Sequence, residues 1–321
     1  MTERFVDAGR DWIAERRAVG RTISTSTQKA YRTDLASWAR YLEAQTGAAP
    51  LLEDLTGPVI KAALAQMNGA GLSAATRRRL LATLRGLCRF LVLESRLPSD
   101  PTVSIQSPRA SSRLPVAFTD GQIAELLSTA QAEDPQARPA APLLDTAIVL
   151  ILAAGGLRAS EAAGLKLTDY LRGEDSSLRV LGKGRKTRIV PLDSGVAEQI
   201  DLYLPWRAEQ AADPEGGPLL VRPGGRALTR DTISYRVNRL YARAGIPKPD
   251  GEAAHALRHT YAVSMVDLGV PISEVQQLLG HESIATTGIY LKASASHLRA
   301  AAAAPSAARL LASTPATRRK Q

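Results

Sequence analysis

Residues 178–192 read LRVLGKGRKTRIVPL, and this stretch decides the fold class. Its two ends, 178–181 and 187–192, are short runs of aliphatic and β-branched residues that are typical of strands. A basic, glycine-containing segment, Gly182–Lys186, joins them, so the stretch predicts a β-hairpin with a positively charged tip. A further short strand is predicted at Leu219–Arg222, because a Pro-Gly-Gly turn follows it.

The first hundred residues show the apolar spacing of amphipathic helices. Two stripes carry the pattern: Tyr31, Leu35, Trp38 and Leu42 in one, and Leu80, Leu84, Leu87 and Leu91 in the other. Ser73 is the expected N-cap of the second of these helices, and shorter helices are expected over residues 5–19 and 58–67. Together the four segments predict a small four-helix domain.

Helices are also expected on both sides of the hairpin. Thr119–Gln122 has the pattern of a capping box, residues 143–154 are apolar enough to predict a buried helix, and helical spacing returns from residue 229 onward. Because one hairpin stands among many helices, the predicted fold class is mainly α with a small β-sheet, that is, α+β.

The composition is that of a globular chain of about two domains. It has 321 residues, of which 45% are hydrophobic and 22% charged. The longest apolar run, residues 147–154, is shorter than the roughly 18 residues of a membrane-spanning helix, and no signal peptide is evident. Cys88 is the only cysteine, which excludes an internal disulfide framework and a multi-thiolate metal site, and suits a reducing, cytoplasmic location.

Positive charge is the strongest signal in the composition. Lys and Arg number 41 against 31 Asp and Glu, which gives a net charge of +10. Neither the stretch between Asp54 and Glu94 nor the one between Asp175 and Asp193 contains an acidic residue, and both are rich in Arg and Lys. Such stretches predict a polyanionic partner. Aromatic residues are only 4%, too few for stacking on single-stranded bases, so duplex DNA is favoured and the protein is expected at the nucleoid.

The residues expected to contact DNA lie in these basic stretches. They are Arg77, Arg78, Arg79, Arg85, Arg185 and Lys186. The first three occupy the initial turns of a predicted helix, where the helix dipole disfavours cations. A nearby anion would stabilise them there, and a DNA phosphate is one candidate.

Histidines, an arginine and a tyrosine gather late in the sequence. His255 and Arg258 are three residues apart, so a helix places them on one face. His281 and Tyr290 are nine residues apart, which puts them on opposite faces of an unbroken helix. Gly280 can end one helix and the serine three residues later can N-cap the next, and this break lets the two side chains converge.

Two further charged groups precede the histidines. The glycines of Gly155-Gly-Leu-Arg158 can present Arg158 at the start of the next helix, and Glu161, three residues on, can orient its guanidinium. Lys183 lies between glycines at the hairpin tip and can approach a ligand closely, with Lys186 as the alternative.

These groups together suit chemistry on a phosphodiester. Two guanidiniums can each grip two phosphate oxygens, a histidine can serve as base for a tyrosine nucleophile, whose free pKa is roughly 10, and a lysine can protonate the departing hydroxyl. The sequence has no metal-ligand spacing and no ATP-binding glycine motif, so no metal or cofactor is expected. His259 is expected to pack in the core, and His297 has no assigned role.

The motifs that contain these residues resemble the tyrosine recombinase superfamily, which includes phage integrases and Xer-type recombinases. The matching blocks are GLRASE at 156–161, GKGRKTRIVPL at 182–192, HALRHTY at 255–261, LLGH at 278–281 and IATTGIY at 284–290. They stand in the family's order, and with the helical N-terminal part they cover nearly the whole chain. Gly288 departs from the pattern, because a better helix former is usual just before the tyrosine. No additional arm-site-binding domain is seen, which favours a Xer-like or compact integrase.

The resemblance implies a role for each residue. Tyr290 would be the nucleophile that forms a 3′-phosphotyrosyl link, Arg158 and Arg258 would bind the phosphate, Lys183 would protonate the leaving 5′ oxygen, His255 would be the general base, His281 would hydrogen-bond the phosphate, and Glu161 would support the site. It further implies site-specific recombination through a Holliday junction, by a homotetramer on two duplexes that carry inverted-repeat core sites. The free protein is expected as a dimer or monomer, and an accessory protein is an optional partner.

The same resemblance implies the domain organisation. Residues 1–105 would form a helical, SAM-like core-binding domain, 106–115 a linker, 116–300 the catalytic domain, and 301–321 a tail that packs onto a neighbouring subunit. The linker lies in the proline-rich stretch from Pro98 to Pro115, whose composition suits an extended, exposed connector.

Two other functions share parts of this pattern. A non-catalytic duplex-DNA-binding regulator needs the basic helical domain but not all six polar groups, and forms no covalent adduct. An enzyme like a type IB topoisomerase uses the same chemistry but relaxes supercoils without a specific site.

Overall fold

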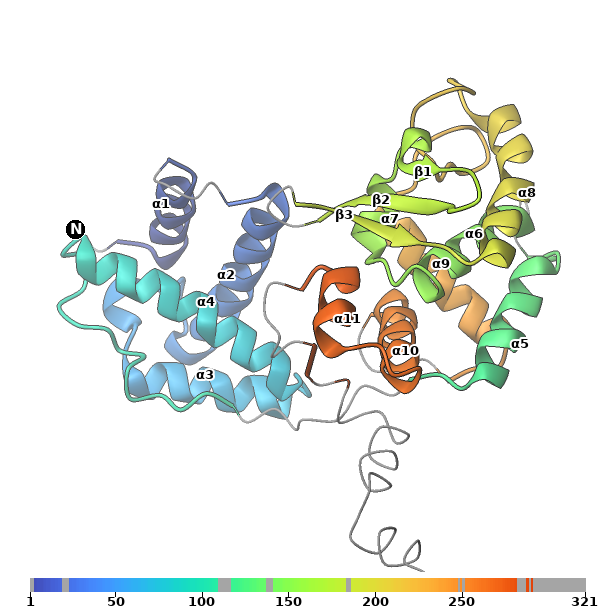
Figure 1. Cartoon of the computed structure of the whole chain (residues 1–321). Helices are drawn as coiled ribbons and strands as arrows, with labels where there is room; N and C mark the ends of the chain where they lie inside the picture. The colour runs from blue at the N-terminus through green and yellow to red at the C-terminus, as the bar shows by residue number, and fades with distance from the viewer. Residues whose placement is uncertain are drawn as a thin grey trace, which may run out of the picture. The chain divides into compact units, whose positions relative to one another are not determined.

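The computed structural model describes residues 3–18, 23–108, 117–136, 141–182, 186–247, 249, 252–281, 287–288 and 290. The chain divides into two compact units, Met1–Arg113 and Leu114–Gln321 (Figure 1). The described residues form helices in both units and one three-stranded sheet, which confirms the predicted α+β class. None of the helices in these ranges is both long enough and apolar enough to span a membrane.

The N-terminal unit contains the four predicted helices. They are α1 (Phe5–Ala18), α2 (Thr25–Thr46), α3 (Gly57–Gly69) and α4 (Ala74–Leu93), with a short 3-10 helix at Leu52–Asp54. Ser24, Thr56 and Ser73 cap three of them, since each side chain accepts the backbone N–H of the residue three positions on. The cap predicted at Ser73 is therefore confirmed.

Both predicted apolar stripes face one core. Trp38 is fully buried and donates its indole N–H to the carbonyl of Leu80 over 2.8 Å, so it links α2 to α4. The four leucines of the α4 stripe are buried in the same cluster, whereas Tyr31 packs against it only partly buried. Burying each leucine side chain contributes about 2 kcal/mol to the free energy of unfolding, so this core stabilises the unit.

The proline-rich segment after α4 is anchored to the N-terminal unit at two positions. Thr102 and Ile105 are buried, and Ile105 belongs to the apolar core of the N-terminal unit. Asp100 accepts the backbone N–H of Thr102 over 2.8 Å and its hydroxyl over 2.6 Å, which fixes a tight turn. Thr102 and Ile105, which precede the predicted linker at 106–115, are therefore packed onto the N-terminal unit, while residues 109–116 fall outside the described part of the chain.

The C-terminal unit surrounds one buried helix, α6, with other helices and places a small sheet beside them. Its helices are α5 (Asp120–Gln131), α6 (Pro142–Ala153), α7 (Ala159–Gly164), α8 (Ser194–Gln210), α9 (Arg230–Arg243), α10 (Ala253–Asp267) and α11 (Ile272–Leu279). As predicted, α6 is buried along most of its length; it packs against α5, α8, α9 and α10. The predicted capping box at the start of α5 is also present.

The sheet is antiparallel with the order β1-β2-β3. Its strands are β1 (Tyr170–Leu171), β2 (Ser177–Leu181) and β3 (Thr187–Pro191). The predicted hairpin is the β2–β3 pair, in which Val180 lies opposite Arg188. Strand β3 also contacts α11, so the hairpin lies next to the elements that carry the late motifs.

The strand predicted at Leu219–Arg222 is wrong. Of these residues only Val221 makes a bridge, an isolated one with Ala227, although Leu219, Leu220 and Val221 are all buried. The N–H of Leu219 donates to the carbonyl of Leu165 over 2.8 Å, and that of Val221 donates to the hydroxyl of Tyr203 over 3.0 Å. The apolar residues therefore belong to a buried loop. A short apolar run in the sequence cannot show whether it forms such a loop or a strand.

Candidate active site

Arg158 is held at the start of α7 by the turn before it. Gly156 has φ +62°, and a Cβ at this position would lie 2.3 Å from a ring carbon of Tyr261, so only glycine fits. The backbone N–H of Arg158 donates to Oε2 of Glu161 over 2.9 Å, and its Nη1 donates to Oε1 over 2.8 Å. The contact that the spacing of Arg158 and Glu161 predicts is therefore present.

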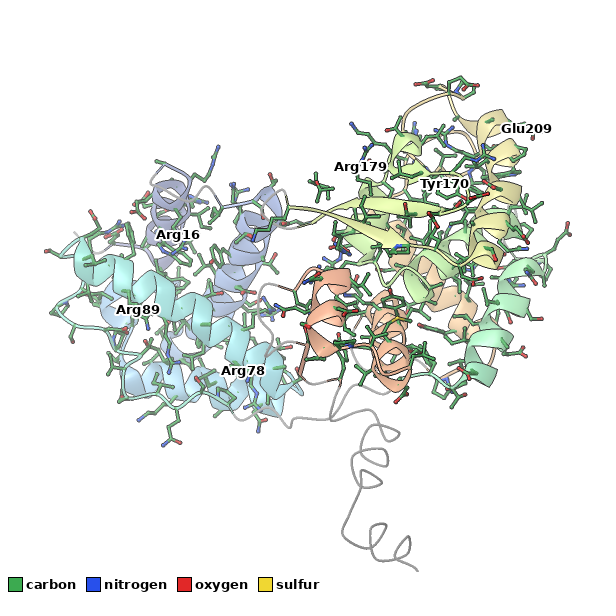
Figure 2. All side chains as sticks on the ribbon, viewed as in Figure 1. Arg16, Arg78, Arg89, Tyr170, Arg179 and Glu209 are labelled. Atoms are coloured by element: carbon green, nitrogen blue, oxygen red, sulfur yellow. The ribbon has the colours of Figure 1, made fainter. Side chains whose placement is uncertain are left out.

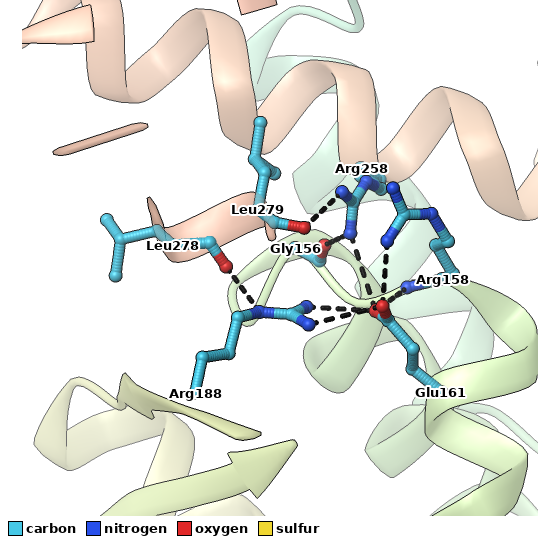
Figure 3. Close-up of polar contacts among 7 residues, drawn as sticks. All are labelled: Gly156, Arg158, Glu161, Arg188, Arg258, Leu278 and Leu279. Atoms are coloured by element: carbon cyan, nitrogen blue, oxygen red, sulfur yellow. Dashed lines mark hydrogen bonds and ion pairs between the residues drawn. The ribbon is translucent and has the colours of Figure 1, made fainter. Parts of the chain in front are cut away.

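Glu161 is the centre of a cluster of three arginines (Figure 3). Besides the contact with Arg158, its carboxylate accepts two hydrogen bonds from Arg188: Nη1 donates to Oε1 over 3.1 Å and Nη2 donates to Oε2 over 2.9 Å. Nη1 of Arg258 lies 3.4 Å from Oε2. Burial raises the pKa of Glu161, but the hydrogen bonds and charges of the arginines outweigh burial and hold the pKa below its ordinary value. Three guanidiniums and one ionised carboxylate leave the cluster with a net charge of +2.

Arg258 is fully buried, and one donor of its guanidinium is not bound by any residue in the described ranges. Nη1 donates to the carbonyl of Gly156 over 2.8 Å, and Nη2 donates to the carbonyl of Leu279 over 2.5 Å. Its Nε has no hydrogen-bond partner among the described residues. Burial and the charge of Arg158 lower the pKa of Arg258 to about 10, so the side chain is still charged at neutral pH. A buried charged donor without an acceptor indicates a place for an anionic ligand.

Tyr290 lies near this cluster, but its hydroxyl contacts a histidine. The side chain is 1% exposed and packs in a small apolar core with Tyr261 and Leu279. Its hydroxyl lies 3.1 Å from Nδ1 of His259. Burial raises the pKa of Tyr290 and outweighs the opposing charge of Arg258, which is close enough to lower it. The phenol is therefore both protonated and buried.

The expectation that His259 only packs in the core is wrong. It is half-buried on α10, its ring centroid lies 4.3 Å from that of His255, and it is the histidine that reaches Tyr290. Burial, followed by the charge of His255, lowers its pKa to about 4, so His259 is neutral at neutral pH. A sequence signal exists, because His259 follows His255 by four residues and so shares its helix face. His255 itself is exposed and contacts His259.

His281 reaches Tyr290 through the predicted break in the helix. α11 ends at Gly280, which has φ +63° in the left-handed region. Nδ1 of His281 lies 2.9 Å from Oγ1 of Thr287, and its ring stacks on that of Tyr290 with centroids 6.2 Å apart. Burial, with the charge of Arg258, lowers the pKa of His281 to about 4. The predicted convergence of the two side chains is confirmed, while the predicted cap at Ser283 lies outside the described residues.

The hairpin tip is described only at its base. Lys183 and Arg185 fall outside the described residues, and Lys186 is exposed. The N–H of Gly182 donates to the carbonyl of Lys186 over 2.8 Å and closes the hairpin. Lys183 and Lys186 thus both remain candidates for the proton donor. Within the described ranges, His, Cys, Asp and Glu nowhere gather into a group that could hold a metal ion.

The predicted DNA contacts on α4 differ in whether their side chains already have partners inside the domain. Arg78 is exposed (Figure 2). Arg79 forms an ion pair with the buried carboxylate of Asp34. The anion expected near this arginine is therefore a side chain of the same domain and not a DNA phosphate. Arg77 and Arg85 each donate to a backbone carbonyl. Arg78 is therefore the most available of the four for an external phosphate.

Burial of two neutral histidines should make the fold sensitive to acid. His259 and His281 titrate near pH 6.5 when unfolded but at about 4 when folded, so the unfolded state binds more protons between these values. The free energy of unfolding should therefore decrease as the pH falls from about 6.5 towards 4, by about 1.4 kcal/mol per pH unit for each histidine. Urea unfolding at a series of pH values measures the slope. His259→Gln should flatten it, and an unchanged slope would contradict the assignment.

Comparison with known proteins finds the same two parts. Residues 117–297 match the phage integrase family, and residues 17–95 match the phage integrase N-terminal SAM-like domain. Tyrosine recombinase XerC of Rhodospirillum centenum is 35% identical over 287 residues, which cover 87% of this chain and 80% of that protein. Tyrosine recombinase XerD of Shewanella oneidensis is 31% identical, with 84% of this chain and 86% of that protein covered.

Solved structures share the fold. The XerH site-specific recombinase bound to a palindromic difH substrate, in a post-cleavage complex, matches with a TM-score of 0.71 at 22% identity, covering 93% of this chain and 84% of that one. A lambda integrase tetramer bound to a Holliday junction matches with a TM-score of 0.69 at 18% identity, covering 92% of this chain and 78% of that one.

Proposed function

The chain belongs to the phage integrase family and is a tyrosine-type site-specific recombinase, and we propose that it cleaves and rejoins duplex DNA at the arginine cluster around Glu161, with Tyr290 as the nucleophile. The observation that carries this assignment of the site is Arg258, a buried cation whose Nε has no partner in the part of the chain that the structure describes. It lies close enough to Tyr290 for each charge to affect the other's pKa. A scissile phosphate has the charge and the acceptor oxygens that such a donor requires.

Arg158 and Arg258 would hold the scissile phosphate. Arg158 is about one-third exposed, so it can meet a ligand from solvent, and Arg258 offers Nε from within the fold. Both guanidiniums are already fixed by Glu161, and Arg258 also by backbone carbonyls. They therefore need little reorganisation when negative charge accumulates on the pentacoordinate phosphorus of the transition state.

In the cleavage step the oxygen of Tyr290 bonds to phosphorus while the bond from phosphorus to the 5′ oxygen breaks. The phenolic proton passes to a histidine, with His255 as the general base, and the departing 5′ oxygen takes a proton from Lys183 or Lys186. His281 donates a hydrogen bond to the phosphate. The 3′-phosphotyrosyl ester conserves the energy of the broken bond, so the 5′ hydroxyl of a partner strand can attack it and rejoin the DNA.

Tyr290 must leave its buried position before this step. A phenol that is 1% exposed and hydrogen-bonded to His259 does not reach a DNA phosphate. Cleavage therefore requires a movement that exposes the hydroxyl of Tyr290, and with it the buried Nε of Arg258, when DNA or a second protomer binds. Gly288, two residues before the nucleophile, lowers the local helix propensity and so favours this movement of Tyr290.

We propose a homotetramer on two duplexes as the working assembly, each duplex with an inverted-repeat core site. Lambda integrase has been solved as a tetramer on a Holliday junction and XerH on a palindromic substrate, and the similarity of fold supports the same arrangement for this chain. The free protein would be a monomer or dimer, an accessory protein would be an optional partner, and the reaction would take place in the cytoplasm at the nucleoid.

Covalent capture tests the function and finds the DNA site. A pool of nicked duplexes with randomised inverted-repeat arms is incubated with the protein and denatured in detergent, and the protein-bound DNA is sequenced. We expect one palindromic sequence to be enriched and the adduct to map to the peptide that contains Tyr290. Duplex binding without any adduct would instead indicate a non-catalytic regulator. Adducts on unrelated sequences, together with relaxation of supercoils, would indicate a topoisomerase-like enzyme.

Affinity for duplex DNA should fall steeply with salt, because each phosphate contact releases counterions. Arg78→Ala should reduce the slope of log affinity against log salt concentration by about 1 and should weaken binding to all sequences alike. Fluorescence anisotropy over a salt series measures both effects. A salt response that is nearly flat for the wild-type protein would contradict a phosphate-based interface.

A further inference from the structure

Arg188 connects three parts of the C-terminal unit through one guanidinium. It projects from β3, its side chain is only 11% exposed, and two of its nitrogens hold both oxygens of Glu161 on α7. Its Nε donates to the carbonyl of Leu278 in the last turn of α11 over 2.6 Å. Figure 3 shows the guanidinium between these two partners. The proposed chemistry gives this residue no role.

We propose that Arg188 is a positioning residue for DNA cleavage: it fixes the carboxylate that orients Arg158 and Arg258, and it fixes the end of the helix that leads to His281. This inference rests on the proposed function of the site. It adds to that function a residue that does not touch the phosphate but determines where the phosphate-binding groups stand.

The first part of the argument concerns Glu161. A planar guanidinium that binds both carboxylate oxygens removes the carboxylate's freedom to rotate. With Arg188 in place, Oε1 faces Nη1 of Arg158, and Oε2 faces the backbone N–H of Arg158 and Nη1 of Arg258. Without Arg188 the carboxylate keeps its other partners but loses the bidentate contact that sets its plane. Both phosphate-binding arginines would then shift together.

The second part concerns the end of α11. The last carbonyls of a helix have no partner within the helix. Here two consecutive ones are satisfied by guanidiniums, that of Leu278 by Arg188 and that of Leu279 by Arg258. Cations at this end also interact favourably with the helix dipole. Because both guanidiniums also contact Glu161, the start of the segment that carries His281 is tied to the arginine cluster.

Gly280 shows how closely the chain passes this side chain. It follows the two carbonyls, has φ +63°, and a Cβ there would lie 3.1 Å from Nη1 of Arg188 and 3.4 Å from its Cδ. The left-handed conformation and the close approach both favour glycine at this position. The turn that leads to His281 is therefore built directly against the guanidinium of Arg188.

Arg179 on β2 provides a matched control. It belongs to the same sheet and has the same kinds of partner, because its Nε pairs with the carboxylate of Asp169 over 3.1 Å and its Nη2 donates to the carbonyl of Thr168 over 2.9 Å. Neither partner belongs to the Glu161 cluster. Loss of an arginine from the sheet is thus separable from loss of the contact with Glu161.

The test compares full-length wild-type protein with Arg188→Ala, Arg188→Gln and Arg179→Ala on the nicked duplex enriched by covalent capture. The rate of adduct formation at saturating DNA should fall about 100-fold in both Arg188 variants, as expected when reacting groups shift by about 1 Å. The dissociation constant for DNA should change by less than about 3-fold, since Arg188 does not touch the phosphate. Arg179→Ala should match the wild type in both quantities. Adding methylguanidinium should raise the rate of Arg188→Ala towards that of the wild type and should leave the wild-type rate unchanged.

The outcomes separate this inference from the function on which it rests. No adduct with the wild-type protein overturns the proposed function and the positioning role together. A wild-type adduct with unchanged rates in the Arg188 variants overturns only the positioning role. Urea unfolding identifies a variant that fails to fold, and the second substitution at the same position then decides the question. A slow rate that methylguanidinium does not raise, in a variant with a normal unfolding midpoint, also contradicts the proposal.

Discussion

Tyr290→Phe should form no covalent protein–DNA adduct while binding duplex DNA as tightly as the wild type. The substitution removes one oxygen from a buried ring and leaves the packing with Tyr261 and Leu279 unchanged. It also removes the hydrogen bond to His259, which should lower the free energy of unfolding by about 1 kcal/mol. The fold and the DNA-binding surfaces therefore persist, and only the atom that attacks phosphorus is lost.

Adduct formation on the captured duplex measures this directly. Tyr261→Phe is the matched control, because it removes a hydroxyl from a neighbouring buried tyrosine in the same apolar cluster. This variant should cleave at the wild-type rate. A covalent adduct that persists in Tyr290→Phe would mean that another residue is the nucleophile, and the site would have to be assigned again.

The fold could be predicted where local signals agree. On α4, the cap Ser73 and a stripe of leucines at helical spacing both point to a helix, and the structure has it. Prediction failed where the state of a segment depends on distant partners. Leu219–Arg222 has the composition of a strand, but its backbone groups bond to a loop and to a tyrosine side chain. Ile105 is buried by helices that the surrounding prolines do not reveal.

The site could be predicted only in part. Spacing indicates which helix face a residue occupies, so His255 and Arg258 were placed together and the contact of Arg158 with Glu161 was expected, whereas His259 was assigned to the core. It does not indicate which of two histidines on that face meets Tyr290, because this depends on where the chain returns after α11. Arg188 was hidden for the same reason: its partners lie 27 residues before it and 90 residues after it.

The second large effect is expected at Arg258, where lysine should not replace arginine. An ammonium group cannot span the carbonyls of Gly156 and Leu279 and still present a donor to the phosphate. Losing one preorganised donor to the reacting phosphate should slow cleavage by about 10²–10³-fold. A buried carbonyl left without a donor should lower the free energy of unfolding by about 1–3 kcal/mol. Single-turnover cleavage and urea unfolding measure the two effects on the same preparation.

Arg207→Lys distinguishes lost chemistry from lost stability. Arg207 is 1% exposed, and its guanidinium also binds backbone carbonyls, those of Pro214, Gly216 and Pro218, on a different part of the unit. Lysine there should destabilise the protein to a similar degree but leave the cleavage rate of the folded enzyme unchanged. If Arg258→Lys cleaves as fast as Arg207→Lys, positive charge alone suffices at this position. The fork geometry of Arg258 would then not be what holds the phosphate in line with Tyr290.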